Sequence, residues 1–174
     1  MEGRAMRILV TVASRHGATA EIGSAVADVL RADGHSVDEA APDEVVDVTP
    51  YDAVVLGSAV YTAHWLPAAR DFGSRFAPDL RRRVVWVFSS GLATQPAASA
   101  NSPHELLALM QDVGALGHRA FAGRLLRSEL AFAERALIAG ARAKEGDHRD
   151  FDAVRAWAGQ LAEHLRTLAP AATA

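Results

Sequence analysis

Three short and almost continuous apolar runs constrain the fold of this chain more than any other feature. They lie within RILVTVA at 7–13, YDAVVLGSAV at 51–60 and RRRVVWVFSS at 81–90. A strand with one solvated face alternates apolar and polar side chains, whereas these runs leave no polar face. The pattern therefore predicts strands that are covered on both sides.

Segments with helical spacing of apolar residues separate these runs. Helices are predicted at 19–33, 66–78, 102–114, 128–143 and 145–168, the last with Asp147 or Asp150 as its cap. Two shorter segments, at 35–40 and 118–125, are predicted to be an edge strand and the last strand.

Strands that alternate with helices must be parallel, because each return needs a crossover. We therefore expect an α/β fold, a doubly wound three-layer sandwich around a five-stranded parallel sheet. The order 2-1-3-4-5 is one of the two common solutions for such a sheet.

Length and composition exclude several classes of protein. A chain of 174 residues suits one domain, expected over 1–174 with an ordered core at about 7–168. A net charge of -3 gives no sign of nucleic-acid binding, which usually needs a strongly basic face. Cysteine is absent, so disulfides and thiol catalysis are excluded. Without a membrane-spanning run or a distinct signal-peptide segment, we expect a cytoplasmic protein.

Three loops should meet at one edge of the expected sheet. They lie at 14–19, 58–65 and 89–100, after the first, third and fourth strands. In open parallel sheets, ligands bind beyond the carboxyl ends of the strands, near the point where the strand order reverses. The loops are rich in Ser, Gly, Thr and aromatic residues rather than acids, which favours a ligand site at this edge.

The first loop, SRHGAT, has the features of an anion site. Gly17 allows the backbone to approach a ligand closely, and Ser14 and Thr19 carry hydroxyl groups. A helix that starts near Thr19 directs its free N–H groups at the loop, where phosphate is a common ligand. The alternative is that Ser14 and Thr19 only cap the helix. Arg15 and His16 suit solvated positions, although His16 could also hydrogen-bond a phosphate.

The other two loops could hold a flat ring. Tyr61 and Trp65 lie in GSAVYTAHW and can stack on such a ligand, or pack against a helix instead. Ser89, Ser90 and Gly91 open the third loop and can bring backbone amides close to a ring edge. The alternative for this loop is an ordinary connection.

Together these segments resemble the flavodoxin superfamily. Within it, they are most similar to flavodoxin-domain proteins related to the menaquinone-dependent protoporphyrinogen dehydrogenases. The segments that carry the resemblance are ASRHGATAEIG, YDAVVLGSAVYTAHW, VVWVFSSG, FAGRL and EGDHRDFDAVRAWA, in the same order along nearly the whole chain. The resemblance implies the flavodoxin-like form of the fold.

The resemblance also implies FMN as the cofactor. The residues that it places around the phosphate are Ser14, Arg15, His16, Gly17, Ala18 and Thr19. Those along one side of the isoalloxazine ring are Ser58, Ala59, Val60, Tyr61 and Trp65, and those at its other edge are Ser89, Ser90, Gly91 and Leu92. Because the flavin carries the redox chemistry, no side chain is named as catalytic and no metal site is expected.

Three functions fit this reading. The first is an FMN-dependent oxidoreductase, for which the resemblance implies a porphyrinogen donor and a quinone acceptor. The second is a non-enzymatic electron carrier, and the third is a binding module that has lost FMN. His16 supports the third, because flavodoxin phosphate loops usually carry a hydroxyl residue before the glycine. A homodimer would suit a small flavoprotein.

The segment 124–144 raises the question of membrane contact. Its charged residues are Arg124, Arg127, Glu129, Glu134, Arg135, Arg142 and Lys144. A basic amphipathic helix could touch a membrane surface, where quinones reside. The favoured alternative is that the apolar residues pack on the sheet while the arginines are solvated; these apolar residues are Leu130, Ala133, Leu137 and Ala141.

Overall fold

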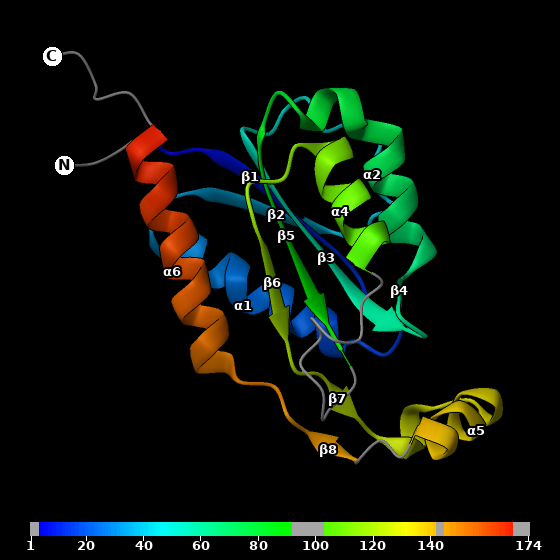
Figure 1. Ribbon diagram of the computed structural model, residues 1–174. Helices are drawn as coiled ribbons and strands as arrows, with labels where there is room; N and C mark the ends of the chain where they lie inside the picture. The colour runs from blue at the N-terminus through cyan, green and yellow to red at the C-terminus, as the bar shows by residue number, and fades with distance from the viewer. Residues whose placement is uncertain (1–3, 92–102, 142–144, 169–174) are drawn as a thin grey trace, which may run out of the picture.

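The computed structural model describes residues 4–91, 103–141 and 145–168, with the main sheet at its centre (Figure 1). The sheet has the order β2-β1-β3-β5-β6, and all four pairings along this path are parallel. The strands are β1 (Arg7–Ala13), β2 (Ser36–Ala40), β3 (Ala53–Tyr61), β5 (Val84–Ser90) and β6 (His118–Phe121). Counted without the short β4, this is the order 2-1-3-4-5, so the predicted fold and strand order are confirmed.

The central strands are buried on both faces, as their apolar runs predict. In β3 every residue except Tyr61 is buried, and in β5 every residue except Val84. The half-polar segment after the first helix forms β2, which is the edge strand expected there.

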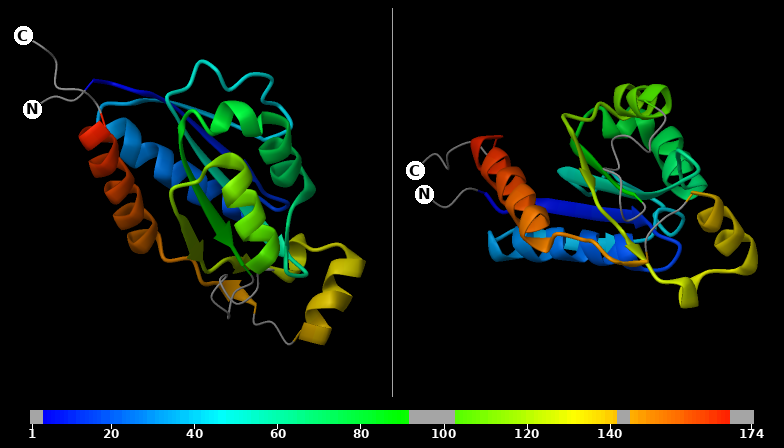
Figure 2. Two further views of the ribbon diagram at one scale, coloured as in Figure 1. Left: turned by 45° about the horizontal axis from the view of Figure 1, so that its top comes forward. Right: turned by 60° about the horizontal axis from the view of Figure 1, so that its bottom comes forward.

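Two pairs of helices cover the sheet (Figure 2). Helices α1 (Ala18–Ala32) and α6 (Phe151–Leu168) pack together on one face, and α2 (Pro67–Leu80) and α4 (Pro103–Val113) on the other. Under α6, the rings of Phe88, Phe121 and Trp157 make edge-to-face contacts with centroids 5.7–6.0 Å apart. These layers form the predicted three-layer sandwich.

The chain departs from the prediction after β6. The expected strand at 118–125 breaks at Ala122 and Gly123, and β7 (Arg124–Leu125) pairs with β8 (Gly146–Asp147) in an antiparallel ribbon. The terminal helix therefore cannot start at 145. It begins at Phe151, where the Asp150 carboxylate accepts a hydrogen bond from the Ala153 N–H at 3.0 Å.

The expected helix at 128–143 is also divided, and it does not pack as expected. It consists of the short 3-10 helix η1 (Arg127–Glu129) and of α5 (Phe132–Ala141), which projects beyond the sheet edge (Figure 1). Leu130 is buried, but Ala133 is exposed and Phe132 is 89% exposed. The expectation that Ala133 packs on the sheet is wrong, and the side chains of Leu137 and Ala141 lie outside the described part.

A two-residue turn after β3 was not foreseen. The short strand β4 (His64–Trp65) folds back on the end of β3, with Val60 opposite Trp65. The turn residues Thr62 and Ala63 have φ angles of 49° and 66°. Such left-handed turns match the twist of a hairpin, although side chains other than Gly and Asn adopt them at a cost.

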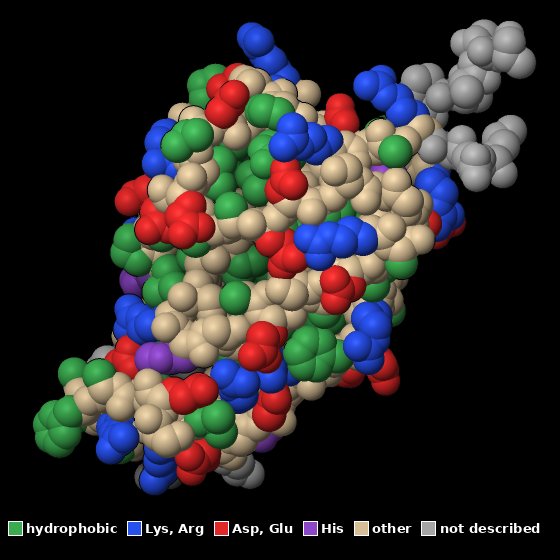
Figure 3. All heavy atoms as spheres, turned by 180° about the vertical axis from the view of Figure 1, so that it is seen from behind, with side chains coloured by type: hydrophobic (Ala, Val, Ile, Leu, Met, Phe, Trp, Pro, Cys, Tyr) green, Lys and Arg blue, Asp and Glu red, His purple; other side chains and the backbone are tan. Residues whose placement is uncertain are grey.

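The surface carries charges of both signs. On the face opposite to that of Figure 1, acidic and basic side chains are interspersed rather than gathered by sign (Figure 3). None of the helices in the described ranges is long and apolar enough to cross a membrane.

The close approach of Gly57 to Phe88 gives a stability test. A Cβ at Gly57 would overlap the Phe88 ring, which is fully buried, whereas a Cβ at Gly159 in α6 would meet nothing within 4 Å. We expect Gly57→Ala to lower the free energy of unfolding by about 1–3 kcal/mol through overpacking. Gly159→Ala should raise it by about 0.5–1 kcal/mol, as for Ala over Gly in a helix. Urea denaturation measures both, and equal effects would contradict the packing argument.

Candidate functional site

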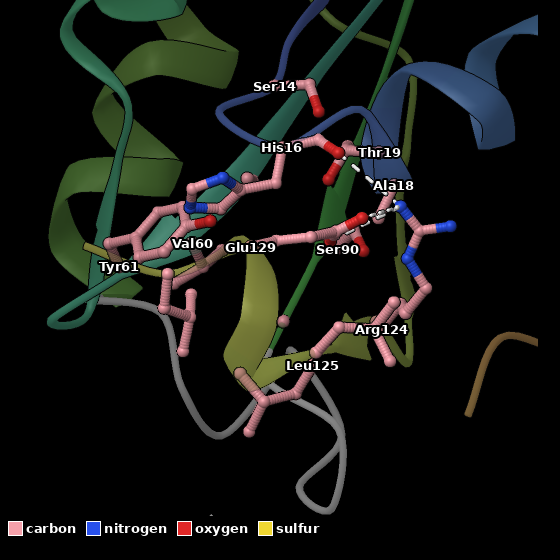
Figure 4. A pocket seen from close by; sticks show the side chains of 15 residues that line it. Ser14, His16, Ala18, Thr19, Val60, Tyr61, Ser90, Arg124, Leu125 and Glu129 are labelled. Atoms are coloured by element: carbon pink, nitrogen blue, oxygen red, sulfur yellow. Dashed lines mark hydrogen bonds and ion pairs between the residues drawn. The ribbon is translucent and has the colours of Figure 1, made fainter. Parts of the chain in front are cut away.

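The carboxyl ends of β1, β3 and β5 meet at one edge of the sheet, together with the segment that follows β6. A cavity with a free volume of about 30 Å³ lies there (Figure 4). It is lined by Ser14, His16, Ala18, Thr19, Ala59, Val60, Tyr61, Ser90, Gly91, Gly123, Arg124, Leu125, Leu126, Glu129 and Leu130. The three predicted loops therefore converge, and a fourth segment joins them.

The loop after β1 is folded around Gly17. Gly17 has a φ of 87° and is the N-cap of α1, which has no side-chain cap hydrogen bond. The Gly17 N–H donates instead to Ser14 Oγ at 3.1 Å, within the loop. Thr19 lies within the first turn of α1 and is not its cap, whereas Ser14 satisfies the N–H of the N-cap residue, so the capping alternative holds for Ser14 alone. Ala18 and Thr19, in the first turn of α1, line the cavity where the helix presents its free N–H groups and positive end.

Arg124 brings a second positive group to the same place. Its Nη2 donates to the His16 carbonyl at 3.4 Å and pairs with Glu129 Oε1 at 3.2 Å, and its Nη1 lies 3.7 Å from Glu21. The side chain is only 16% exposed. Its Nε is buried and has no hydrogen-bond partner within the described part of the chain. The guanidinium and the helix N-terminus together place positive charge and hydrogen-bond donors at this corner, where Glu21 and Glu129 offset part of the charge.

A different carboxylate, Glu134, binds the side chains of Arg15 and His16 in the first loop. It pairs with Arg15 Nη1 and with His16 Nε2, both at 2.9 Å, and accepts a hydrogen bond from the Ala131 N–H at 3.1 Å. The hydrogen bond from Arg15 holds the pKa of Glu134 below its usual range. These bonds join the loop to the first turn of α5, while the Arg15 guanidinium stacks 4.5 Å from the Tyr61 ring centroid.

The loop after β3 divides into a lining part and a supporting part. Ala59, Val60 and Tyr61 line the cavity. Burial raises the pKa of the Tyr61 phenol, so this side chain is neutral at physiological pH. Ser58 is buried outside the lining, where its Oγ donates to the Ala59 carbonyl at 2.8 Å and accepts from the Leu66 N–H at 3.0 Å.

The third loop divides in the same way. Ser90 and Gly91 line the cavity, and Leu92 lies outside the described residues. Ser89 Oγ instead accepts a hydrogen bond from Trp65 Nε1 at 2.8 Å and lies 2.8 Å from His118 Nε2. Trp65 is 3% exposed, so among the predicted site residues Ser58, Trp65 and Ser89 form a supporting layer behind the lining.

Sequence reasoning missed the lining that comes from the segment after β6. The residues concerned are Gly123, Arg124, Leu125, Leu126, Glu129 and Leu130. The sequence signal for this lining was the Gly-Arg pair at 123–124, directly after the last strand of the sheet. The carboxyl end of that strand lies at the same sheet edge as the three predicted loops. Gly123 is required there, because a Cβ at this position would overlap the Gly91 carbonyl oxygen.

The arrangement suits a ligand with an anionic end and a flat body. Arg124 and the first turn of α1 form a donor-rich corner, while Tyr61, Val60 and Leu125 add apolar surface next to it. A phosphate bound at such a corner is stabilised by the helix N-terminus and by charge-assisted hydrogen bonds.

A family comparison gives this geometry a context. The model of the family described as "Flavodoxin domain" matches residues 9–152, which include every lining residue. No curated protein matches the sequence.

Solved structures with the same fold include proteins of several kinds. The rubredoxin oxygen:oxidoreductase of Desulfovibrio gigas is 12% identical with a TM-score of 0.65, over 98% of this chain and only 38% of its own length. The Streptococcus pneumonia TIGR4 flavodoxin is 19% identical (TM-score 0.59), and oxidised Flavodoxin 2 of Bacillus cereus is 20% identical (TM-score 0.57). Each of these two matches covers 91% of this chain and 99% of the flavodoxin. At these identities the likeness establishes the fold.

The supporting layer makes stability depend on pH through His118. Burial lowers the pKa of His118, so the folded protein keeps this ring neutral where the unfolded chain, with a pKa of about 6.5, takes up a proton. The free energy of unfolding should therefore fall as the pH drops below about 6.5.

His118→Gln should flatten this part of the pH profile, whereas His104→Gln, at an exposed position of α4, should leave it unchanged. Urea denaturation between neutral and mildly acidic pH measures the slope. A His118→Gln profile parallel to that of the wild type would refute the assignment.

Proposed function

Because the chain belongs to the flavodoxin domain family, we propose that it binds FMN in the cavity at the carboxyl edge of the sheet and acts as a redox protein. The family implies a flavin. The observation that supports a phosphorylated flavin is Arg124, which lies beside the N-terminus of α1 with its Nε buried and without a partner within the described part of the chain.

The phosphate end of FMN fits the donors in this corner. Arg124 and the first-turn amides of α1 would hold the phosphate, with Thr19 next to them. Ser14 would act indirectly, by fixing the shape of the loop, since its Oγ already accepts a hydrogen bond from the Gly17 N–H. A Cβ at Gly17 would meet nothing within 4 Å, but its left-handed φ favours glycine. His16 replaces the usual hydroxyl residue, and its backbone carbonyl orients Arg124.

The flavin ring would lie toward the other end of the cavity. Tyr61 and Val60 would provide one wall, and the backbone of Ser90 and Gly91 would border the other edge. When bound, FMN would supply one-electron and two-electron chemistry. The side chains of this chain would orient it, shield it from water and set the charge around it.

The electron donor and acceptor are a further part of the proposal. A porphyrinogen donor with a quinone acceptor is supported by the sequence resemblance alone. A non-enzymatic electron carrier is the second candidate, supported by two flavodoxins whose whole length this chain matches in fold. Turnover of porphyrinogen with a quinone would favour the enzyme, whereas reduction by a flavodoxin reductase without such turnover would favour the carrier.

The role of Arg124 gives the test of cofactor binding. Arg124→Gln should weaken FMN binding by about 1.5–3 kcal/mol, the value of a hydrogen bond to a charged group, which is about 10- to 150-fold in Kd. Riboflavin lacks the phosphate, so its Kd should not change. Titration followed by flavin fluorescence measures both ligands.

A matched variant, Arg155→Gln, removes an exposed arginine of α6 and should bind FMN like the wild type. An equal loss for FMN and riboflavin in Arg124→Gln would show that Arg124 does not contact the phosphate.

A further inference from the structure

The carboxylate of Glu129 lies inside the cavity, at the corner proposed for the phosphate. It reaches in from η1 and pairs with Arg124 Nη2 at 3.2 and 3.5 Å through its two oxygens (Figure 4). Both residues line the cavity, and their side chains point toward one another from opposite sides. Glu129 thus forms an ion pair with the Arg124 guanidinium at the position proposed for the phosphate.

The other contacts of Arg124 differ from the contact with Glu129. Glu21 lies on α1, is 54% exposed and is shared with Arg149, while the His16 carbonyl belongs to the backbone of the loop. The His16 carbonyl cannot leave without a change in the loop backbone, and Glu21 is also held by Arg149, whereas Glu129 pairs with Arg124 alone among the described residues. Glu129 is attached through a flexible side chain and is 35% exposed, so it can move away at small cost.

The position of the Glu129 carboxylate on Arg124 requires such a movement. A phosphate ester bound to Arg124 would need the space and the hydrogen-bonding positions that the Glu129 carboxylate takes. A phosphate at this position would also repel the Glu129 carboxylate, because both groups are negatively charged.

We propose that Glu129 is an internal competitor of the ligand phosphate. It pairs with Arg124 in the absence of an anionic ligand and is displaced by a phosphate monoester, so that it lowers the affinity of the site and keeps cofactor exchange fast. The inference rests on the proposed function for the identity of the ligand, but the competition itself concerns any phosphate.

A second anchor allows Glu129 to move alone. Glu134 holds the first turn of α5 to the loop through Arg15 and His16, and within the described residues it makes no hydrogen bond or ion pair with Arg124. Leu130, between the two carboxylates, is 8% exposed. Displacement of Glu129 therefore leaves α5 attached, and only the side chain and the short η1 turn need to rearrange.

The decisive variant is Glu129→Gln, which keeps the shape of the side chain and removes its charge. It should tighten FMN binding by about 1.5- to fivefold, the range for loss of one partly exposed ionic competitor, and should slow FMN dissociation. Riboflavin affinity should stay as in the wild type. Glu163→Gln, an exposed carboxylate of α6 remote from the cavity, is the matched control.

A double-mutant cycle tests whether the effect passes through Arg124. In an Arg124→Gln background, Glu129→Gln should give no gain in FMN affinity, because the competitor and the ligand would no longer share a guanidinium. An unchanged or weaker FMN affinity of Glu129→Gln in the wild-type background, or the same gain with Arg124 removed, would overturn the inference.

Failure of the proposed function would look different. If wild-type protein bound no FMN, inorganic phosphate would serve as the probe, followed by its effect on the thermal midpoint. A larger stabilisation of Glu129→Gln than of wild type by phosphate would support the competition without the cofactor. An equal effect of phosphate on both proteins would reject the competition.

Discussion

The site depends on how positive charge is balanced at the N-terminus of α1. The first turn of this helix presents free amides and the positive end of its dipole, and Arg124 adds a guanidinium that is 16% exposed. A largely buried cation is stable only when anions pair with it, because burial of an unpaired charge costs free energy. Within the described part of the chain, Glu21 and Glu129 are the carboxylates that form ion pairs with Arg124.

The elements around the cavity are arranged to hold this charge in position. Arg149, 5% exposed, donates to the Ala18 carbonyl at 3.2 Å and pairs with Glu21 and Asp147, which ties the start of α6 to the start of α1. The hydrogen bond from Arg149 lowers the pKa of Asp147 to about 2, so this carboxylate stays ionised at physiological pH. The β7–β8 ribbon pairs the backbone of Arg124 with that of Asp147, and the Asp147 side chain pairs with Arg149. The ribbon therefore fixes Arg124 and Arg149 relative to each other.

The sequence predicts the parts of this structure that follow from burial. Runs such as 53–56 have no polar face, so the central strands and the converging loops could be predicted, whereas the strand order is one of two common solutions and is selected by the resemblance to the flavodoxin superfamily. What could not be predicted depends on contacts between distant segments. Ser58 and Ser89 carry hydroxyls suited to a ligand, but in the folded protein these hydroxyls accept hydrogen bonds from the Leu66 N–H and from Trp65 Nε1. Both serines therefore lie in the supporting layer. Arg124 and Glu129 looked like one face of a basic helix, because the pairing of β7 with β8 has no local signal in the sequence.

The central claim is that the cavity holds a phosphorylated flavin. The most direct measurement is the visible absorption spectrum of the purified protein after incubation with FMN and removal of free flavin by desalting. The account predicts a retained two-banded flavin spectrum with about one FMN per chain, as expected for one such cavity. A colourless protein after this treatment would contradict it.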